Sequence, residues 1–334
     1  MAATHTLIVE PDDARTLAVN TLNAAKNSID LTIYEISDPA IVNALQAAQA
    51  KGVTVRVLYN WYSFSADTQQ REVLPAIDTL TKAGIQCKPA PEAFELTHEK
   101  AFVIDGATAI IMSFNLTSEY FGTTRDFGIV TTVAAEVAEV ASVFNADWSG
   151  QAITPSVASM VWSPSNSRTK LTALVGSAKK TLDIYCEEVD DPGTLGAMTA
   201  AAKKGVTVRL MAAVLSGDGK VNGNARGITF LRAGGVNAVC KSFLYIHAKM
   251  VLVDYGAAGA NAFVGSENFS CVSLDDNREC GIIVTEPAIL DRLHTTYESD
   301  WAQPNVAVTP DSTAIAACQG NPAGRAKARA LSRT

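Results

Sequence analysis

The chain has 334 residues, 48% of them hydrophobic and 18% charged, and 27 Lys and Arg against 34 Asp and Glu give a net charge of −7. This length corresponds to about two domains, and the composition supplies a core and excludes disorder, collagen and a coiled coil. The acidic balance counts against a duplex-DNA binder, which needs basic surface to release counterions. No apolar run approaches the roughly 18 residues of a membrane span, and the first residues do not resemble a signal peptide.

Internal repetition determines the predicted architecture. The hexapeptide KGVTVR at 51–56 recurs unchanged at 204–209, a shift of 153 residues (204 − 51). The same shift relates Asp30 to Asp183, Glu35 to Glu188, Asp38-Pro39 to Asp191-Pro192, Arg125 to Arg278, and Asp147-Trp148 to Asp300-Trp301. The chain is therefore two copies of one unit, and we expect lobes at 1–152 and 153–308 followed by a C-terminal tail at 309–334.

The elements expected in each unit follow one another in the same order. A helical stretch comes first, and then a strand, at 29–36 in the first copy and at 182–189 in the second. Asp-Pro pairs predict the N-cap and first turn of the next helix, and Gly52 and Gly205 predict its end. The β-branched runs at 53–58 and 206–211 indicate buried parallel strands that are reached by βαβ crossovers. The sequence thus predicts an α/β fold, and it assigns 151–168 to a connector.

Residues with catalytic chemistry lie later in each unit. Residues 98–105 read HEKAFVID and residues 247–254 read HAKMVLVD, so both spell H-x-K-x(4)-D. If each octad is a strand, His98 and Lys100 point to one face, and so do His247 and Lys249. Only four histidines exist in the chain, and two of them fall in these matching octads. We therefore interpret the octads as a functional pair.

A return strand is predicted after each octad, and both return strands end in a Ser-x-Asn pattern. Ser113 and Asn115 follow the first octad, and Ser266 and Asn268 follow the second. Alternate residues of a strand share a face, so these side chains can donate hydrogen bonds beside the His-Lys pair.

Two imidazoles among lysine, asparagine and serine donors suit a phosphate diester that becomes pentavalent. One neutral imidazole can attack phosphorus, and the other, when protonated, can donate a proton to the leaving oxygen. No cluster of carboxylates with His or Cys at metal spacing accompanies the octads, so we expect no metal and no other cofactor.

A nucleophilic histidine needs a carboxylate that fixes its tautomer. Asp126 and Glu279 occupy equivalent places in the repeat and are the first candidates for this role. Glu35 and Glu188, near the ends of equivalent strands, are the second candidates; a capping or surface role is the alternative for these carboxylates.

Other residues of the same types have structural interpretations. Asp105 and Asp254 close the octads on the strand face opposite the histidines, so we expect them to hold the turn or an ion pair. His5 and His294 lack comparable neighbours and are interpreted as surface or structural residues.

The six cysteines contain no C-x-x-C pair, which excludes the usual zinc and thioredoxin-like motifs. An even count permits disulfides, but in a chain of this length we favour ordinary small core residues. Because a mature protein lacks the leader of its precursor, the sequence does not determine the cellular compartment. We favour a secreted or periplasmic protein over a cytoplasmic one.

The duplicated H-x-K-x(4)-D, followed by G-S-x-N, resembles the phospholipase D superfamily over about residues 6–304. The resemblance implies two α/β/α lobes with mixed sheets, related by a pseudo-twofold axis, with one active site between them. It also implies metal-independent phosphodiester hydrolysis or transfer through a phosphohistidine, with His98 as the nucleophile and His247 as the general acid. The implied phosphate ligands are Lys100, Lys249, Asn115 and Asn268, assisted by Ser113 and Ser266. Met112 departs from the pattern, because it stands where the family usually has glycine.

The superfamily contains several activities, so the fold alone does not choose a substrate. Aromatic clusters at 61–64 and 243–245 favour a phospholipid headgroup diester at a membrane interface, with core packing as the alternative explanation. The second hypothesis is a nuclease acting on single-stranded nucleic acid, although the net charge counts against it. A noncatalytic binding protein is disfavoured by the two complete octads, and a membrane-embedded cardiolipin synthase by the lack of an apolar span. We expect a monomer that transfers the phosphatidyl group to water or an alcohol, with a Gly-rich surface loop at 216–224 near the entrance.

Overall fold

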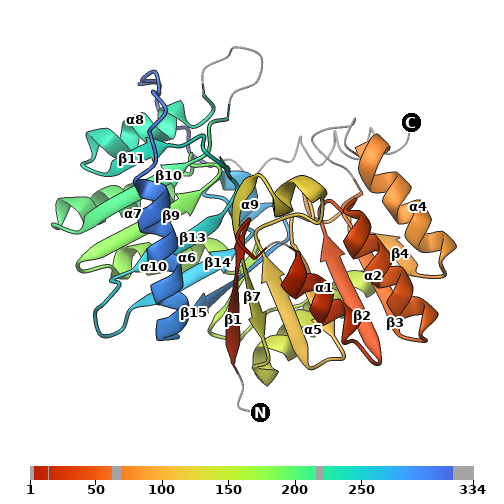
Figure 1. Cartoon of the computed structure of the whole chain (residues 1–334). Helices are drawn as coiled ribbons and strands as arrows, with labels where there is room; N and C mark the ends of the chain where they lie inside the picture. The colour runs from red at the N-terminus through yellow and green to blue at the C-terminus, as the bar shows by residue number, and fades with distance from the viewer. Residues whose placement is uncertain (1–3, 14, 62–68, 216–221, 319–334) are drawn as a thin grey trace.

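The computed structural model describes residues 4–318 except for residue 14 and the segments 62–68 and 216–221. It contains two mixed sheets, each flanked by helices, and Figure 1 shows the N-terminal half of the chain on the right and the C-terminal half on the left. Within the described residues, none of the helices combines the length and hydropathy needed to cross a membrane.

The first lobe is built on a sheet with the strand order β1-β7-β6-β5-β2-β3-β4. Its strands are β1 (His5–Glu10), β2 (Ser28–Ile33), β3 (Thr54–Tyr59), β4 (Gln86–Pro89), β5 (Ala101–Ile104), β6 (Thr108–Met112) and β7 (Thr124–Thr131). Its helical elements are α1 (Thr16–Asn23), α2 (Pro39–Ala50), η1 (Gln69–Val73), α4 (Leu74–Lys82), η2 (Ser118–Phe121) and α5 (Ala134–Ser149). Strands β2, β3 and β4 are mutually parallel, whereas the other neighbours in the sheet are antiparallel.

The second lobe repeats this topology, with the strand order β8-β15-β14-β13-β9-β10-β11. Its strands are β8 (Met160–Ser163), β9 (Thr181–Cys186), β10 (Thr207–Ala212), β11 (Asn237–Cys240), β13 (Lys249–Val253), β14 (Asn261–Gly265) and β15 (Glu279–Val284). Its helices are α6 (Ser167–Ser177), α7 (Pro192–Lys203), α8 (Ala225–Ala233), α9 (Cys271–Asp275) and α10 (Pro287–Trp301). The short strand β12 (Tyr245–Ile246) leaves this lobe and pairs with β7 of the other. The predicted duplicated α/β fold is confirmed.

Local sequence signals explain where the crossover helices begin and end. Asp38 caps α2 by accepting a 3.0 Å hydrogen bond from the Ala40 N–H, and Asp191 caps α7 in the same way. Gly52 and Gly205 follow these helices with φ near +90°, a conformation that residues with a Cβ rarely adopt. Each helix therefore delivers the chain to a strand parallel to the one before it, as predicted.

The predicted connector at 151–168 is wrong in its second half. Met160–Ser163 form β8, which pairs antiparallel with β15, and α6 begins at Ser167. The buried Trp162 anchors this edge strand in the core. A strand also precedes the first expected helix of each unit, which the prediction missed because β1 and β8 are short edge strands whose partners lie far along the sequence.

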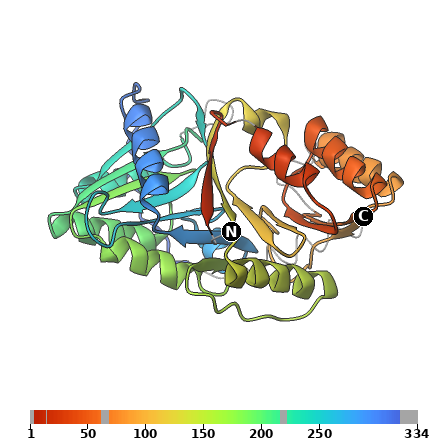
Figure 2. The ribbon, with the colours of Figure 1, turned by 60° about the horizontal axis from the view of Figure 1, so that its bottom comes forward.

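The inner faces of the two sheets meet in one hydrophobic core. Leu7 and Val103 of the first sheet belong to the same buried cluster as Trp162 and Val264 of the second, and α5 and α10 also pack there. Two outer cores lie beneath α1, α2 and α4 in one lobe and beneath α6, α7 and α8 in the other. Figure 2 shows the first sheet between α5 on one side and α1 and α2 on the other. Each lobe is thus an α/β/α layer structure that shares its inner layer with its neighbour.

Two buried ion pairs cross between the lobes and are related by the repeat. Arg125 donates from Nε to Asp300 at 2.6 Å, and Arg278 donates from Nη2 to Asp147 at 2.9 Å. Each arginine lies in or next to the last strand of one sheet, and each aspartate lies near the end of the long helix of the opposite lobe. The repeated Arg and Asp residues therefore fix how the two copies meet.

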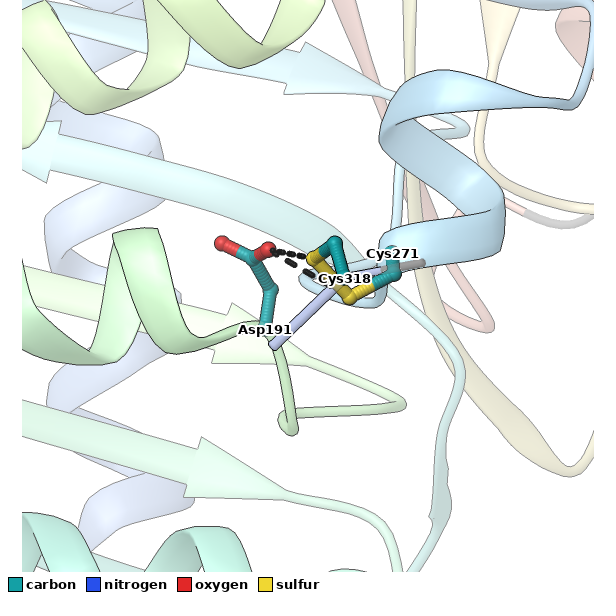
Figure 3. A group of neighbouring side chains, drawn as sticks. All are labelled: Asp191, Cys271 and Cys318. Atoms are coloured by element: carbon teal, nitrogen blue, oxygen red, sulfur yellow. Dashed lines mark hydrogen bonds between the residues drawn. A yellow bond between two sulfur atoms is a disulfide. The ribbon is translucent and has the colours of Figure 1, made fainter. Parts of the chain in front are cut away.

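The expectation that the cysteines are ordinary core residues is wrong for two of them. Cys271, at the start of α9, forms a disulfide with Cys318, beside the capping carboxylate of Asp191 (Figure 3). The other four are free, and three of these are buried. The disulfide holds the end of the described chain against the second lobe, so part of the predicted 309–334 tail is attached. Residues 319–334, most of the Gly-rich loop and residues 62–64 of the first aromatic cluster lie outside the described part of the chain.

Candidate active site

The start of each octad is held by the opposite lobe. Strand β12 places His247 beside β7, where the backbone N–H of His247 donates to the Arg125 carbonyl at 3.2 Å. In the same way the backbone N–H of His98 donates to the Arg278 carbonyl at 2.9 Å, next to a parallel β-bridge between Thr97 and Arg278. The predicted octad strands are too long, because β5 and β13 begin only after the histidines. Pairing across the lobes, rather than strand alternation alone, positions the imidazoles.

Each histidine also receives its carboxylate from the opposite lobe. His98 Nδ1 lies 2.8 Å from Glu279, and His247 Nδ1 lies 2.9 Å from Asp126. These are the first-choice carboxylates of the sequence analysis. A carboxylate only accepts when ionised, so Nδ1 carries the proton and Nε2 is left to react.

Further hydrogen bonds fix the two carboxylates. The second oxygen of Glu279 accepts from Ser273 Oγ at 2.7 Å and from Asn277 at 3.0 Å. Asp126 accepts from Ser113 Oγ and from Thr124 Oγ1, both at 2.6 Å. Neither carboxylate can rotate without breaking several bonds at once, which holds both rings in place.

Burial lowers the pKa of the His98 imidazole. Desolvation, reinforced by the nearby Lys100 and opposed by Glu279, lowers the pKa of His98 to about 4. Burial alone would raise the pKa of Glu279, but the adjacent His98 and Lys100 lower it overall, so the carboxylate stays ionised. His98 is therefore neutral near pH 7, as a nucleophile requires.

The two lysines are almost completely buried beside the histidines. Lys100 Nζ donates to the His98 carbonyl at 2.7 Å and lies 5.2 Å from the centre of the Tyr34 ring. Lys249 Nζ donates to the His247 carbonyl at 2.5 Å. Desolvation together with repulsion from Lys249 lowers the pKa of Lys100 to about 7. Each lysine is thus held by the backbone carbonyl of the histidine two residues before it, and neither is among the residues that line the cavity between the histidines.

Both histidines line a single cavity of about 340 Å³. Asn115 and Asn268 line it as well, and the structure therefore brings the four residues together from both lobes. The cavity is also acidic and aromatic, and the lining residues of these kinds are Tyr34, Glu35, Tyr120, Glu187, Glu188 and Asp190.

The donors predicted for phosphate already have partners. Asn115 Nδ2 lies 3.3 Å from Glu35, and Asn268 Nδ2 lies 3.2 Å from Glu187. One N–H of each amide is therefore already used by a carboxylate, and an incoming phosphate shares the amide with that carboxylate.

The two serines differ from their predicted role. Ser113 donates to Asp126, and Ser266 bonds the Cys280 backbone, and neither serine lines the cavity. In this structure both serines connect neighbouring strands, and Ser113 also supports the orienting carboxylate of Asp126.

The remaining carboxylates of the sequence analysis also have clear positions. Glu35 and Glu188 line the cavity but do not hold Nδ1 of either histidine, so the second-choice assignment is wrong. Asp105 accepts from the backbone N–H groups of residues 26–28, and Asp254 accepts from those of 179–181. Both aspartates have positive φ in the octad turns, so their structural interpretation is confirmed.

Glu187 is the site residue that sequence reasoning missed. Its carboxylate accepts from Lys249 Nζ at 2.8 Å and from Tyr245 Oη at 2.6 Å, and it lies 3.5 Å from His247 Nε2. The signal was present in the repeat, because the 153-residue shift places Glu187 opposite Tyr34. Tyr34 in the first copy is aromatic and Glu187 in the second is acidic, and such a change at matched positions just after a strand indicates that the two halves of the site differ.

Comparison with known proteins agrees with this architecture. The family model described as cardiolipin synthase, PLD-like domain, matches residues 18–148 and again residues 171–301. No match was found among curated protein sequences.

Solved structures share the fold at low sequence identity. Phosphatidylserine synthase from Haemophilus influenzae Rd KW20 has a TM-score of 0.69 at 14% identity, covering 98% of this chain and 93% of that one. Polyphosphate kinase from Porphyromonas gingivalis has a TM-score of 0.69 at 15% identity, covering 99% of this chain. The present chain spans 56% of the length of that kinase.

The two segments matched by the family model make up well over half of the chain, and each contains one of the paired histidines. The chain therefore belongs to the phospholipase D superfamily, in the cardiolipin synthase PLD-like domain family, with the domain present twice.

Proposed function

We propose that this protein is a metal-independent phosphodiesterase of the phospholipase D type that cleaves or exchanges phospholipid headgroups. The observation that carries the proposal is the shared cavity, where two imidazoles from different lobes meet and each Nδ1 is held by a buried carboxylate. Two buried ammonium groups beside them supply positive charge for a phosphate diester.

His98 is the proposed nucleophile because its ring is neutral at pH 7 and its Nδ1 proton is bound to Glu279. Its Nε2 attacks phosphorus, the bond from phosphorus to the headgroup oxygen breaks, and the leaving oxygen takes a proton from His247 Nε2. His247 then accepts a proton from water or an alcohol, whose oxygen attacks phosphorus and releases His98. Hydrolysis yields a phosphatidic acid, whereas an alcohol yields a new phosphatidyl ester.

A lipid substrate is supported by the surface next to His247. Phe243 and Tyr245 are both more than one-third exposed, and Tyr245 stacks on the His247 ring. Exposed aromatic side chains beside a reactive centre suit an acyl-chain or interfacial contact. The acidic residues around the cavity oppose the polyanionic backbone of a nucleic acid, which disfavours the nuclease alternative.

The test measures choline release from short-chain phosphatidylcholine, with EDTA present, alongside cleavage of single-stranded DNA. The His98→Ala and His247→Ala variants should each lose at least about a hundredfold in rate. His294→Ala is the matched control, because His294 lies outside the cavity and should leave the rate unchanged. Mass spectrometry of His247→Asn with substrate should find the phosphoryl adduct on His98.

Three results would contradict the proposal. An adduct on His247 would reverse the assignment of nucleophile and acid. Loss of activity in EDTA would refute the metal-independent mechanism, and DNA cleavage without choline release would replace the lipid substrate by nucleic acid.

A further inference from the structure

The carboxylate of Glu187 lies among the groups expected to hold phosphate in the second lobe. It accepts from Lys249 Nζ at 2.8 Å and from Asn268 Nδ2 at 3.2 Å, and it lies 3.5 Å from His247 Nε2. Lys249 and Asn268 each have a further N–H group, so a phosphate oxygen that binds them shares them with this carboxylate and brings a second negative charge beside it. The Glu187 side chain is only 15% exposed, so the two negative charges repel each other unless a positively charged group joins them.

The cavity also presents hydrogen-bond acceptors that have no donor. Asn115 directs Nδ2 to Glu35 and Asn277 directs Nδ2 to Glu279, and because a carboxylate accepts, these contacts fix which way each amide faces. The opposite atoms, Asn115 Oδ1 and Asn277 Oδ1, find no partner among the described residues. Both residues are at least nine-tenths buried and line the cavity. Unfilled acceptors of this kind call for a ligand that brings donors.

Aromatic rings complete the surroundings on the side of His247. The Tyr120 ring packs edge-on against His247 at 4.7 Å between centroids, and Tyr245 stacks on it at 6.2 Å. Tyr245 Oη donates to Glu187 at 2.6 Å, so the ring and the carboxylate form one surface. Carboxylates beside aromatic faces are the usual surroundings of an ammonium group.

We propose that Glu187, with Tyr120 and Tyr245, forms a binding subsite for an amino alcohol, so that the headgroup cleaved or accepted next to His247 carries a positively charged nitrogen. This inference rests on the proposed function and names its substrate class. A zwitterionic headgroup brings both charges: its phosphate shares Lys249 with Glu187, and its ammonium pairs with the Glu187 carboxylate. A neutral headgroup such as glycerol leaves the phosphate and the Glu187 carboxylate, two negative charges, beside Lys249 without a further positive partner, which is unfavourable.

The first experiment compares kcat/KM for soluble short-chain phosphatidylethanolamine, phosphatidylcholine and phosphatidylglycerol. The wild-type protein should prefer the two cationic headgroups to glycerol by at least about tenfold, and Glu187→Gln should remove about tenfold of this preference, equivalent to about 1.4 kcal/mol. The ratio between lipids is the readout, because removing the carboxylate also frees Lys249 and changes all rates together. Glu92→Gln, an exposed position outside the cavity, makes the same charge change and should preserve the preference.

The second experiment separates this inference from the lipid assignment. Hydrolysis of bis(p-nitrophenyl) phosphate reports the phosphodiesterase centre without a lipid, and tetramethylammonium or ethanolammonium chloride should inhibit it in the wild-type protein but not in Glu187→Gln. Potassium chloride at equal ionic strength is the control. Inhibition that depends on Glu187 supports the subsite even if no lipid is cleaved, in which case only the lipid assignment fails. Equal rates on the three lipids, a preference that survives Glu187→Gln, or no inhibition by either amine would overturn the subsite.

Discussion

His98 and His247 occupy equivalent positions in the repeat, yet their neighbours differ. The ring of Tyr34 packs against His98 at 4.9 Å between centroids, whereas the matched residue of the second copy, Glu187, lies beside Nε2 of His247. The neutral aromatic ring gives His98 no counter-charge, whereas the acidic neighbour suits the proton-donor role that we propose for His247. At the residue scale, the two copies of the motif therefore differ in the direction that the proposed nucleophile and acid roles require.

The pH dependence of catalysis follows from the charges of His98 and Lys100. The pKa of about 4 for His98 means that its ring becomes neutral as the pH rises above that value, and the pKa of about 7 for Lys100 means that its ammonium is lost above that value. We expect kcat/KM to rise through about pH 4 and to fall above about pH 7, since this quantity reports the free enzyme. Lys100→Arg, which stays charged, should shift the upper limb to higher pH. A flat profile, or an unchanged upper limb in the arginine variant, would contradict this assignment.

Glu267 explains a sequence difference between the two return strands. It follows Gly265, and a Cβ built at that glycine would come within 2.4 Å of the Glu267 carboxylate. The matched residues of the first lobe are Met112 and Phe114, both buried. Phe114 needs no such space, so the departure of Met112 from the family's glycine is a consequence of packing.

The Glu267 carboxyl also makes a stability prediction. Burial, together with repulsion from Glu279, raises its pKa well above the ordinary value, so folding retains a proton that the unfolded chain releases above about pH 4.5. Stability is therefore lost as the pH rises through this window. Glu267→Gln should stabilise the protein relative to wild type by an amount that grows by up to about 1.4 kcal/mol for each pH unit above about 5. Urea unfolding at several pH values measures it, with exposed Glu92→Gln as the control, and a pH-independent difference would refute it.

At the scale of elements, His5 joins three of them. The ring, on β1, bonds Glu136 at the start of α5 at 2.7 Å and also bonds Glu286, which precedes α10. These partners outweigh the effect of burial and raise the pKa of His5 to about 9. His294 stacks on Tyr255 at 3.8 Å between ring centroids. The structural interpretation of both histidines is confirmed, although His5 is more important for joining the lobes than a surface residue would be.

The crossed ion pairs give a stability prediction at this scale. Arg125→Met should destabilise the protein by about 3–5 kcal/mol, because Asp300 stays buried without its guanidinium. The double variant Arg125→Met with Asp300→Asn should recover part of this loss. Arg292→Met is the matched control, since Arg292 is 41% exposed in its pair with Asp13 and should cost no more than about 1 kcal/mol. Denaturant unfolding measures all three, and an equal loss at Arg125 and Arg292 would show that the crossed pair has no special weight.

At the scale of the whole molecule, the disulfide ties the C-terminal segment to the rim of the cavity. Cys271 lines the cavity, and its partner Cys318 lies 47 residues further along the chain. A disulfide persists in an oxidising compartment, which supports our proposal of a secreted or periplasmic location.

Thiol counting tests the disulfide directly. A denatured, unreduced sample should react at four thiols and a reduced sample at six. Cys271→Ser with Cys318→Ser should lower the free energy of unfolding by about 2–4 kcal/mol, because the unfolded chain is no longer constrained. Six reactive thiols without reduction would show that the bond does not form. Cys87→Ser, at a half-buried free cysteine, is the control and should have a smaller effect.

The sequence by itself determined the duplicated fold and the identity of the paired residues. The repeat, the Asp-Pro caps and the β-branched runs are local signals that act within a few residues, and the positions of the octads follow directly from them. Edge strands β1 and β8 were not predicted from the sequence, because a short strand is specified by partners far along the chain. The sequence did not predict the pairing of Cys271 with Cys318 for the same reason, because the two residues are 47 positions apart.

Only the tertiary structure decided which groups meet. The sequence proposed Asp126 and Glu279 as orienting residues, but the exchange of segments between the lobes assigns Asp126 to His247 and Glu279 to His98. Within the lobes, the fold also directs Ser113 to Asp126 and away from the cavity, and brings Glu187 to Lys249 and into the cavity. The physical reason is that strand pairing and burial act between residues more than a hundred positions apart, so the charge and access of a site side chain are set by neighbours that no local pattern contains.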